Sequence, residues 1–439
     1  MSSFAVRRQA GLLGRLSFPG DKSIAHRAII LGALSRGKVR IENFPDNKDC
    51  LWTIASFRKL GIKIKVSKGG VVGVSGKGLR GLSRPASAIF TGESGTTLRL
   101  LLGVLAGQNF KSRVYSASSL ARRPMLRVIA PLRMMGAKIS SRAGEHPPFA
   151  ITGGALRPID YHMPVPSAQV KSAILLAGLF CAGKTRVREK VGTRDHTERM
   201  LKLFKADIKL KGNTIVIKGG KELSSPKKVV IPGDISSAAF FMVLAAITPG
   251  SRFILRNVSL NPSRSGIIKV LRRMGAKIKI SSYKVKAEGS EPAGEIVVES
   301  SSLKGTRIPN KDIPSLIDEI PILMVAATRA KGRTLFEGVG ELRFKETDRI
   351  RSMTVNLRKM GAVISISKAK GLESLSVEGV KELRGAKVRS FGDHRTAMSM
   401  IVAGMAATNK TILDDISCIS KSFPSFLVSL GRLKKAKSH

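Results

Sequence analysis

The sequence predicts an α/β protein with two similar domains, each made of three repeated units. One phrase recurs along the chain, an amphipathic helix that ends in Leu-x-x-Leu/Met-Gly-Ala and leads into a strand in which Lys or Ser alternates with Ile or Val. The phrase returns at intervals of about 70 to 86 residues, which fits a unit of several strands and two helices rather than a solenoid repeat. The length of 439 residues also exceeds what one simple core holds, so six such units form two domains.

Five copies of the phrase are clear, and the sixth is degenerate. The glycine suits the position after a helix end that needs a left-handed backbone, and the hydrophobic period then changes from that of a helix to that of a strand. The six copies place this position at Gly61, Gly136, Lys205, Gly275, Gly361 and Gly431.

Each unit also contains a second, more apolar helix that begins after a turn rich in Gly, Ser, Thr or Asp. Small hydrogen-bonding residues at six helix starts indicate a common focus for the N-termini, because free N–H groups and the helix dipole attract anions there. We expect this focus in a cleft between the two domains. The six turns span residues 20–23, 92–97, 166–169, 233–237, 313–315 and 392–394.

The net charge is strongly positive. The chain has 77 basic and 30 acidic residues, a formal charge of +47, which predicts attraction to anions from phosphorylated metabolites to nucleic acid. The basic residues are spread over the whole length, and only three Tyr and one Trp accompany them, which argues against a dedicated binder of single strands. We therefore expect any attraction to nucleic acid to be nonspecific.

Cysteine use and hydropathy indicate a cytoplasmic protein that does not associate with membranes. Cys50, Cys181 and Cys418 are odd in number and far apart, so the sequence predicts neither a disulfide framework nor a zinc site. The longest apolar runs, 173–182 and 238–247, are about half of the length that crosses a bilayer. We also expect the protein to be a monomer.

The first turn carries the most informative group of side chains. Lys22, Ser23 and Arg27 fall in the first turns of a helix that a Pro-Gly turn introduces, so an ammonium, a hydroxyl and a guanidinium surround free N–H groups. Such a group suits a phosphate or a carboxylate. The alternative interpretation is a capped helix with solvated charges.

Two further segments are candidates for anion contacts. Gly92 and Gly95 would let a ligand approach the backbone of the second turn closely. Arg122 and Arg123 precede a proline, which fits a rigid clamp for a carboxylate or phosphate and fits a solvated basic loop equally well.

The run 178–185 matches the Walker A expression G-x-x-x-x-G-K-T, but its context is reversed. A phosphate loop follows a strand and begins a helix. Here residues 169–179 have helical spacing, and residues 185–191 alternate like a strand. We therefore expect no ATP site in this run.

The second half of the chain carries the candidate proton-transfer groups. Asp318 and Glu319 stand side by side in an otherwise apolar helix start, where burial is costly unless the acids are paired or used. Residues 341–349 pack six charges into nine residues, which also fits an exposed, salt-bridged helix start. No set of His, Cys or carboxylate residues has metal-ligand spacing and no dinucleotide fingerprint follows a strand, so we expect no cofactor.

Taken together, these motifs resemble the 5-enolpyruvylshikimate-3-phosphate synthase family of enolpyruvyl transferases. The resemblance runs in order along practically the whole chain. It is carried by Pro-Gly-Asp-Lys-Ser-Ile-Ala-His-Arg from residue 19, Ser-Gly-Thr-Thr-Leu-Arg from 94, Arg-Arg-Pro-Met from 122, Ser-Ala-Gln-Val-Lys-Ser-Ala from 167, Arg-Asp-His-Thr-Glu-Arg-Met-Leu from 194, Ile-Asp-Glu from 317, Lys-Glu-Thr-Asp-Arg from 345 and Asp-His-Arg-Thr-Ala-Met from 393.

The resemblance implies a two-domain inside-out α/β barrel, in which each domain has three βαβαββ units. It also implies that the chain crosses between the lobes near Gly20 and near Gly233, so that the first strand belongs with the C-terminal lobe. The expected domains are residues 1–20 with 234–439, and residues 21–233.

The resemblance also assigns substrates. For shikimate-3-phosphate it implies contacts from Lys22, Ser23, Arg27, Ser167, Ala168, Gln169, Arg194, Asp318 and Lys345. For phosphoenolpyruvate it implies contacts from Lys22, Gly95, Arg123, Gln169, Glu346, Arg349, Arg395 and Lys421. Most of these residues supply cations or hydrogen-bond donors, which suits two anionic substrates.

The implied reaction is the sixth step of the shikimate pathway, which leads to chorismate and the aromatic amino acids. It transfers the enolpyruvyl group of phosphoenolpyruvate to the 5-hydroxyl of shikimate-3-phosphate and releases phosphate by addition and elimination, without a metal. Glu346 is the candidate that protonates C3, and Asp318 is the candidate base toward the hydroxyl. Lys22 and the arginines would stabilise the transferring charge.

Two alternative interpretations remain open. The UDP-N-acetylglucosamine enolpyruvyl transferases share the fold but commonly use a loop cysteine, and residues 116–125 contain none. A basic nucleic-acid-binding protein without catalysis would account for the net charge. Within the resemblance, Glu93 departs from the pattern, because many family members have Asn there, facing the anionic phosphoenolpyruvate.

Overall fold

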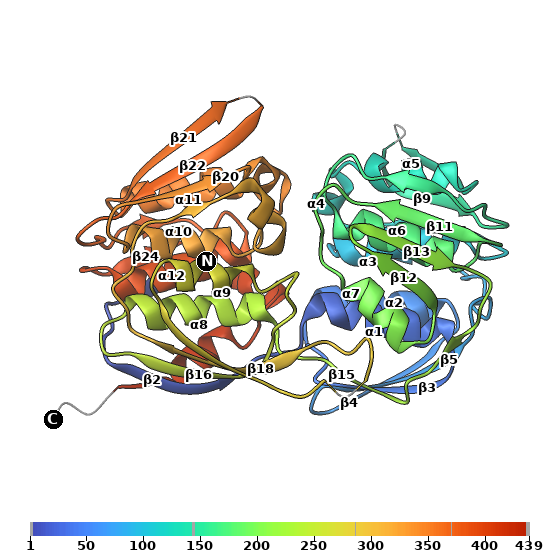
Figure 1. Cartoon of the computed structure of the whole chain (residues 1–439), viewed down its shortest axis with the longest axis horizontal. Coiled ribbons are helices and arrows are strands. Elements are labelled where there is room, and N and C mark those ends of the chain that lie inside the picture. The colour runs from blue at the N-terminus through green and yellow to red at the C-terminus, as the bar shows by residue number, and fades with distance from the viewer. Residues whose placement is uncertain (1–2, 143–144, 286, 370, 436–439) are drawn as a thin grey trace. The chain divides into compact units, whose positions relative to one another are not determined.

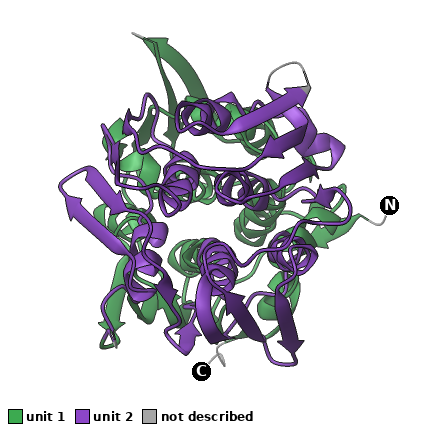
Figure 2. Ribbon diagram, turned by 90° about the vertical axis from the view of Figure 1, so that its right-hand side faces the viewer, with its two compact units in different colours: residues 1–19, 233–284, 292–439 green, residues 20–232, 285–291 purple. Residues whose placement is uncertain are grey.

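The computed structural model describes residues 3–142, 145–285, 287–369 and 371–435 and contains two compact units (Figure 2). Unit 1 comprises Met1–Pro19, Gly233–Lys284 and Pro292–His439, and unit 2 comprises Gly20–Pro232 and Val285–Glu291. The first strands therefore group with the C-terminal part of the chain. The segment Val285–Glu291, which lies inside the range expected for the C-terminal lobe, groups with unit 2.

Unit 2 contains three sheets in which parallel and antiparallel pairs are mixed (Figure 1). Across the first sheet the strands are β14 (Leu223–Ser224), β3 (Ser35–Glu42), β5 (Val71–Lys77) and β4 (Lys63–Ser67), and β15 (Lys228–Val230) also pairs with β3. The second sheet is β6 (Ile89–Phe90), β7 (Lys111–Tyr115), β9 (His146–Thr152) and β8 (Lys138–Arg142). The third is β10 (Asp160–His162), β11 (Lys184–Arg188), β13 (Thr214–Lys218) and β12 (Asp207–Lys211). The helices of unit 2 are α1 (Lys22–Leu34), α2 (Lys48–Lys59), α3 (Gly95–Ala106), α4 (Ser118–Ala121), α5 (Leu126–Met134), α6 (Ala168–Gly178) and α7 (His196–Leu203).

The expected βαβαββ order is present in these sheets. β6 pairs in parallel with β7 across α3, and α5 then leads to the antiparallel strands β8 and β9. β10 to β13 repeat the order around α6 and α7. In the first sheet, the parallel partners of β3 are β14 and β15, from the end of the unit's main segment.

Unit 1 also contains three sheets. The first is β17 (Lys277–Ser282), β18 (Ala293–Glu299), β16 (Arg252–Ser259), β2 (Leu12–Ser17) and β25 (Lys434–Lys435). The second is β19 (Arg307–Ile308), β20 (Arg333–Glu337), β22 (Leu372–Glu378) and β21 (Val363–Ala369), and the smallest is β1 (Phe4–Val6), β24 (Thr411–Leu413) and β23 (Lys387–Val388). The helices are α8 (Ile235–Ile247), α9 (Gly266–Arg273), α10 (Ile320–Thr328), α11 (Arg349–Lys359), α12 (His394–Ala406) and α13 (Phe426–Gly431), with 3₁₀ helices η1 (Asn310–Ser315), η2 (Gly340–Phe344) and η3 (Ser417–Lys421).

The predicted apolar helices form the two cores. They are α1, α3 and α6 in unit 2 and α8, α10 and α12 in unit 1. All residues of α8 are buried, as expected for a helix that is apolar on every side. Helices α8, α10 and α12 contact one another and also contact strands β16, β22 and β24, respectively. The core of unit 1 therefore lies among these helices and between them and the sheets. Among the described residues, no helix is both long and apolar enough to span a bilayer.

Five of the six predicted helix starts are correct. Their caps accept hydrogen bonds from first-turn N–H groups and are Asp21, Ser94, Ser167, Asp234 and Asp393. The prediction is wrong at residues 313–315, which lie in η1, because α10 begins only at Ile320. Pro321 in its first turn explains the later start, since proline is favoured there and has no N–H to satisfy.

The recurring phrase has the expected conformation in five copies. Gly61, Gly136, Gly275 and Gly361 have φ between 81° and 95°, and Lys205 has φ 62°. The sixth copy is wrong, because Gly431 is the last residue of α13 and has no left-handed backbone.

In four copies of the phrase an arginine stands three residues before the glycine, and the structure explains this residue. The side chain of this arginine donates a hydrogen bond to the carbonyl of the residue six positions after it, which ties the helix end to the next strand. These pairs are Arg58 with Ile64, Arg133 with Ile139, Arg272 with Ile278 and Arg358 with Ile364.

The run 178–185 begins at the end of α6 and ends in β11, so the reversed Walker A context is confirmed.

Candidate active site

The start of α1 carries the first group of predicted anion-binding residues. Asp21 Oδ1 accepts hydrogen bonds from the N–H of Ser23 at 2.7 Å and of Ile24 at 3.2 Å. Lys22 Nζ donates to Asp49 Oδ2, in α2, at 3.1 Å. Asp49 therefore holds the Lys22 ammonium at the N-terminus of α1. The ammonium and the positive end of the helix dipole both attract an anion there.

Arg27 is buried and joins three helices of unit 2. Its Nη1 donates to the carbonyl of Ser23 at 2.8 Å, and its Nη2 donates to Ser172 Oγ, in α6, at 2.7 Å. Its Nε donates to Thr197 Oγ1, in α7, at 2.6 Å, and the two hydroxyls of Ser172 and Thr197 lie 2.6 Å apart. The position of this guanidinium is thus fixed by α6 and α7 as well as by α1.

Charges around Arg27 keep it ionised. Burial lowers the pKa of Arg27 to about 10, while the negative charges of Glu198, Asp21 and Glu291 oppose this shift and the positive charge of Arg194 adds to it. A pKa of about 10 leaves the guanidinium cationic at neutral pH, so it can contribute to an anion site.

Gln169 joins the starts of α3 and α6. Its Oε1 accepts from Arg99 Nη1, and its Nε2 donates to Thr96 Oγ1 at 3.0 Å. A Cβ atom on Gly95 would lie 2.8 Å from Arg99 Nη1, so a larger residue there would displace the arginine. Glycine at position 95 therefore leaves the space that the Arg99 side chain needs to reach Gln169.

The other predicted residues of unit 2 lie at helix starts and in loops. Ser167 caps α6 and Ala168 is its first residue. Arg123 follows α4 and its N–H donates to the carbonyl of Leu120 at 3.0 Å. Arg194 lies two residues before the start of α7, and both arginines are partly exposed.

His26 is one end of a buried chain of hydroxyl groups. Its Nδ1 lies 2.6 Å from Thr53 Oγ1, which lies 2.7 Å from Thr97 Oγ1. Thr97 Oγ1 donates to Ser94 Oγ at 2.7 Å. The chain joins α1, α2 and the cap of α3. Burial lowers the pKa of His26 to about 3, so this imidazole is neutral in the folded protein.

His26 makes unit 2 sensitive to acid. Because its pKa is about 3 when folded and about 6.5 when unfolded, the unfolded chain binds one more proton between these values, and stability falls as the pH falls. We expect the His26→Asn variant to lose about 2 kcal/mol less than the wild type when the pH changes from 7 to 5. Denaturant unfolding at both pH values measures this difference, and equal pH slopes would contradict it.

In unit 1, three carboxylates surround Arg349, the first residue of α11. Its Nε donates to Asp393 Oδ2 at 2.9 Å, its Nη1 donates to Asp318 Oδ1 at 3.3 Å, and its Nη2 donates to Glu346 Oε2. Asp393 is fully buried, Asp318 is mostly buried, and the Glu346 side chain is 43% exposed. Glu346 is therefore the most exposed of these three acids, and Asp393 is closed to a ligand.

These charges stabilise one another. Burial alone would lower the pKa of Arg349, but the charges of Asp393, Glu346 and Asp318 raise it above its ordinary value. Burial would raise the pKa of Asp393, but Arg349 lowers it. Both groups are therefore ionised at neutral pH.

Two more arginines approach the carboxylates that precede α10. Arg395 Nη1 donates to the carbonyl of Asp318 at 2.8 Å. Arg264 Nη2 donates to Ser236 Oγ at 2.5 Å, and the same hydroxyl donates to Glu319 Oε1. Glu319 is completely buried in this network, so Asp318 is the member of the adjacent pair that can meet a ligand.

The remaining predicted residues of unit 1 are less buried. Lys345 follows η2 and is partly exposed, and Lys421 is exposed at the end of η3. Within the described ranges, no group of three or more His, Cys, Asp or Glu residues could hold a metal ion.

Several polar residues of these networks were not predicted. They are Asp49, Ser172, Thr197 and Arg264. Asp49 and Arg264 carry no local signal, because their partners lie on other elements. Ser172 and Thr197 are within motifs noted above, so helical spacing from Gln169 and the position next to Arg194 could have indicated them.

The chain is similar over almost its whole length to known proteins. Residues 6–430 match the family model described as EPSP synthase (3-phosphoshikimate 1-carboxyvinyltransferase). A 3-phosphoshikimate 1-carboxyvinyltransferase of Pelotomaculum thermopropionicum is 49% identical over 430 residues, 98% of each chain, and one of Desulforamulus reducens is 47% identical over 416 residues, 94% of this chain and 95% of that one.

Solved structures give the same result. The EPSP synthase of Acinetobacter baumannii has a TM-score of 0.88 at 40% identity, covering 99% of this chain and 98% of that one. The enolpyruvyl transferase NikO of Streptomyces tendae has a TM-score of 0.78 at 17% identity, over 99% of each chain, and shares the fold.

Proposed function

The chain belongs to the EPSP synthase family, the 3-phosphoshikimate 1-carboxyvinyltransferases, and from this premise we propose what its site residues do. It is an enolpyruvyl transferase of the shikimate pathway, which moves the enolpyruvyl group of phosphoenolpyruvate to shikimate-3-phosphate and releases phosphate. The observation that carries this conclusion is the match along residues 6–430. It favours neither the UDP-N-acetylglucosamine enolpyruvyl transferases nor a non-catalytic nucleic-acid binder.

For shikimate-3-phosphate, we propose that cations and hydroxyl groups bind the phosphate and ring oxygens and that Asp318 and Lys345 also serve as contacts of this substrate. Support comes from the buried Arg27, which Ser172 and Thr197 orient, and from the N-terminus of α1. The assigned residues are Lys22, Ser23, Arg27, Ser167, Ala168, Gln169, Arg194, Asp318 and Lys345.

For phosphoenolpyruvate, we propose a set with three arginines, because an arginine binds a carboxylate or phosphate with two hydrogen bonds. Support comes from Arg349 and Arg395, whose donors already contact carboxyl or carbonyl oxygens. The assigned residues are Lys22, Gly95, Arg123, Gln169, Glu346, Arg349, Arg395 and Lys421.

In the proposed mechanism, Asp318 accepts the proton of the 5-hydroxyl of shikimate-3-phosphate. The oxygen of that hydroxyl forms a bond to C2 of phosphoenolpyruvate at the same time. Glu346 in its protonated, carboxylic acid form gives that proton to C3, so that C3 becomes a methyl group and Glu346 becomes a carboxylate. In the elimination, Glu346 takes a proton back from C3, the C2–C3 double bond forms again, and phosphate leaves C2. Lys22 and the arginines stabilise the charge that moves to the phosphate. An anionic ligand at Arg349 would compete with Glu346 and free that carboxyl for proton transfer.

Glu93 gives a prediction about phosphoenolpyruvate binding. Glu93 is part of the 92–97 turn, and its exposed carboxylate accepts a hydrogen bond from Ser119 Oγ at 2.9 Å. Removing this negative charge with Glu93→Asn should lower KM for phosphoenolpyruvate by about two- to five-fold at low salt. The difference should shrink at high salt because exposed charges are screened. An unchanged or higher KM would contradict the prediction.

The sole tryptophan offers a direct measurement of the same effect. Trp52 packs against Gly92, where a Cβ atom would lie 2.1 Å from the indole Nε1. Titration of its fluorescence with phosphoenolpyruvate in the wild type and in Glu93→Asn reports binding without turnover.

The function is tested by release of inorganic phosphate from the purified full-length protein. Release should require both phosphoenolpyruvate and shikimate-3-phosphate, and the product should carry the enolpyruvyl group on the 5-oxygen. No release at any ionic strength would overturn the proposal. A monomer, a cytoplasmic location and a nonspecific attraction to nucleic acid stay predictions from the sequence.

A further inference from the structure

The first turn of α7 is held by three consecutive buried side chains. Thr197 accepts the hydrogen bond from Arg27. Glu198 Oε1 lies 2.7 Å from Lys171 Nζ, in α6. His196 Nδ1 lies 2.7 Å from Glu291 Oε1, and both of these side chains are almost completely buried. Two of these anchors are on core helices, and the third comes from a distant part of the chain.

That third anchor belongs to the segment 287–291, which lies on α7. The N–H of Ser290 donates to the carbonyl of Ala287 at 3.0 Å, and Gly289 has φ +83°, as required at the third position of a type II turn. A Cβ atom on Gly289 would lie 2.4 Å from the carbonyl oxygen of Arg199 and 2.6 Å from the nitrogen of Leu203. The segment therefore contacts the helix through its backbone, which only glycine permits at this position.

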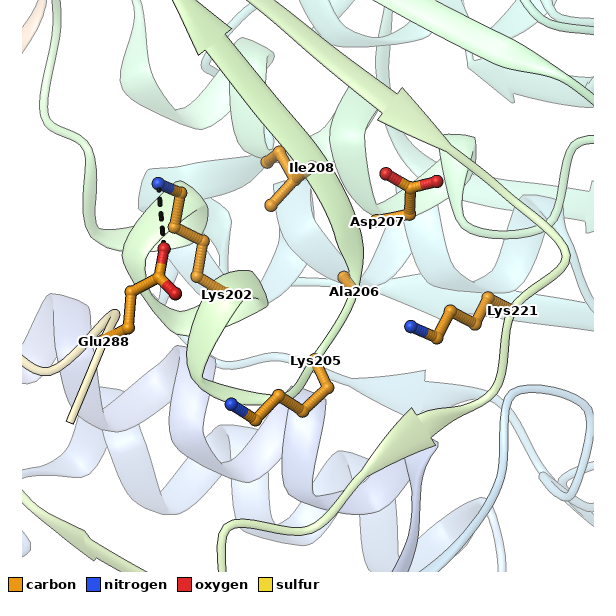
Figure 3. Close-up of a pocket in the computed structure, with 7 residues that line it drawn as sticks. All are labelled: Lys202, Lys205, Ala206, Asp207, Ile208, Lys221 and Glu288. Carbon is orange, nitrogen blue, oxygen red and sulfur yellow. Dashed lines mark ion pairs between the residues drawn. The ribbon is translucent and has the colours of Figure 1, made fainter.

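The third repeat departs from the common phrase where this segment lies. Lys202 replaces the arginine that ties the other helices to their strands, and its Nζ lies 3.5 Å from Glu288 Oε1. Lys205 replaces the glycine and keeps the left-handed backbone. Glu288 and Lys202 also line a pocket of about 330 Å³. Figure 3 shows its lining residues, with a dashed line for the Lys202–Glu288 ion pair. Its lining residues are Lys202, Lys205, Ala206, Asp207, Ile208, Lys221 and Glu288.

The anchor at Glu291 matters because α7 lacks the usual side-chain cap. Asp195 is its N-cap residue but makes no capping hydrogen bond, and its carboxylate accepts from Arg199 Nε at 2.8 Å instead. The first turn carries the carboxylate of Glu198, and Glu291 adds a hydrogen bond between a second buried carboxylate and the ring of His196, the first residue of the helix. The helix has only eight residues, so its position depends on such anchors.

We propose that Glu291 is a positioning residue for Arg27 and Arg194, two of the residues assigned above to shikimate-3-phosphate. Through His196 it fixes the first turn of α7, and with it Thr197, which orients Arg27, and Arg194, which precedes the helix. This inference rests on the proposed function, since it assigns the affected step to the binding of shikimate-3-phosphate.

The test compares Glu291→Ala, Glu291→Gln and the control Glu288→Ala in the full chain. Glu291→Ala should raise KM for shikimate-3-phosphate about ten-fold, which corresponds to about 1.4 kcal/mol. Its kcat should change less than two-fold, and KM for phosphoenolpyruvate should stay unchanged. Glu291→Gln keeps a hydrogen-bond acceptor for His196 and should recover most of the affinity. Glu288 is 76% exposed, so its removal should leave both KM values unchanged.

Calorimetric titration with shikimate-3-phosphate alone should show the same ten-fold loss in Glu291→Ala. A second variant, Gly289→Ala, disturbs the docked turn without touching the His196–Glu291 pair directly and should raise the same KM. An unchanged KM for shikimate-3-phosphate in Glu291→Ala, or an equal loss for both substrates, would overturn the proposal. Absence of turnover in the wild type would instead overturn the proposed function, so the two failures are distinguishable.

Discussion

Replacement of Glu346 by glutamine is expected to slow turnover by about 10² to 10⁴-fold, the usual contribution of a positioned acid or base. Glutamine can still accept a hydrogen bond from Arg349, so the local geometry is retained. It cannot deliver a proton to C3 or take one back, and both half-reactions lose that step. The measurement is the rate of phosphate release at saturating concentrations of both substrates.

The matched control is Glu341→Gln, an exposed glutamate five residues earlier on η2, which should keep kcat within about two-fold. Solvent exchange into C3 adds a second readout. The wild type should incorporate deuterium from D₂O into the enolpyruvyl CH₂ group, and Glu346→Gln should not. A variant that keeps kcat and C3 exchange would remove Glu346 from the mechanism, while loss of both would leave its assigned role standing.

The parts of the fold that depend on local signals could be predicted. The left-handed glycine of the phrase requires only a helix end and a following strand, and it is found at Gly61, Gly136, Gly275 and Gly361. The caps Asp21 and Ser94 follow from the preference of short oxygen-bearing side chains for helix starts. These features need no knowledge of distant contacts.

The features that depend on distant contacts could not be predicted. The buried Arg264 meets Ser236 and Glu319 only after the chain folds, and nothing in its neighbouring sequence separates it from the other arginines of the chain. The segment 287–291 has the composition of an ordinary turn, and its docking on α7 depends on residues about 90 positions earlier. The site residues near Arg349 were named from a family resemblance, whereas their pairing follows from the structure.

Removal of the charge at Arg349 is expected to have the largest effect on stability. Arg349→Met keeps an unbranched, apolar chain of similar reach but leaves Asp393, Asp318 and Glu346 without their shared guanidinium. Loss of one partner of a buried ion pair costs about 3 to 5 kcal/mol, because the other charge stays buried without compensation. Denaturant unfolding of the variant at pH 7 should show this loss, together with a large rise in KM for phosphoenolpyruvate.

The pH dependence and a second substitution identify the source of this loss. In the wild type, Arg349 lowers the pKa of Asp393, so its contribution to stability is full at neutral pH and is lost as the pH falls through the carboxyl range. In Arg349→Met the buried Asp393 has no such partner, so its protonation stabilises the folded variant. The difference in free energy of unfolding between the variant and the wild type should therefore shrink as the pH falls. Asp393→Asn still accepts the cap bonds from the N–H groups of Arg395 and Thr396, and in the Arg349→Met background it should recover part of the lost stability. If the double variant were no more stable than Arg349→Met at pH 7, the uncompensated carboxylate would not be the cause, and the loss would have to come from the packing of α11 against α12.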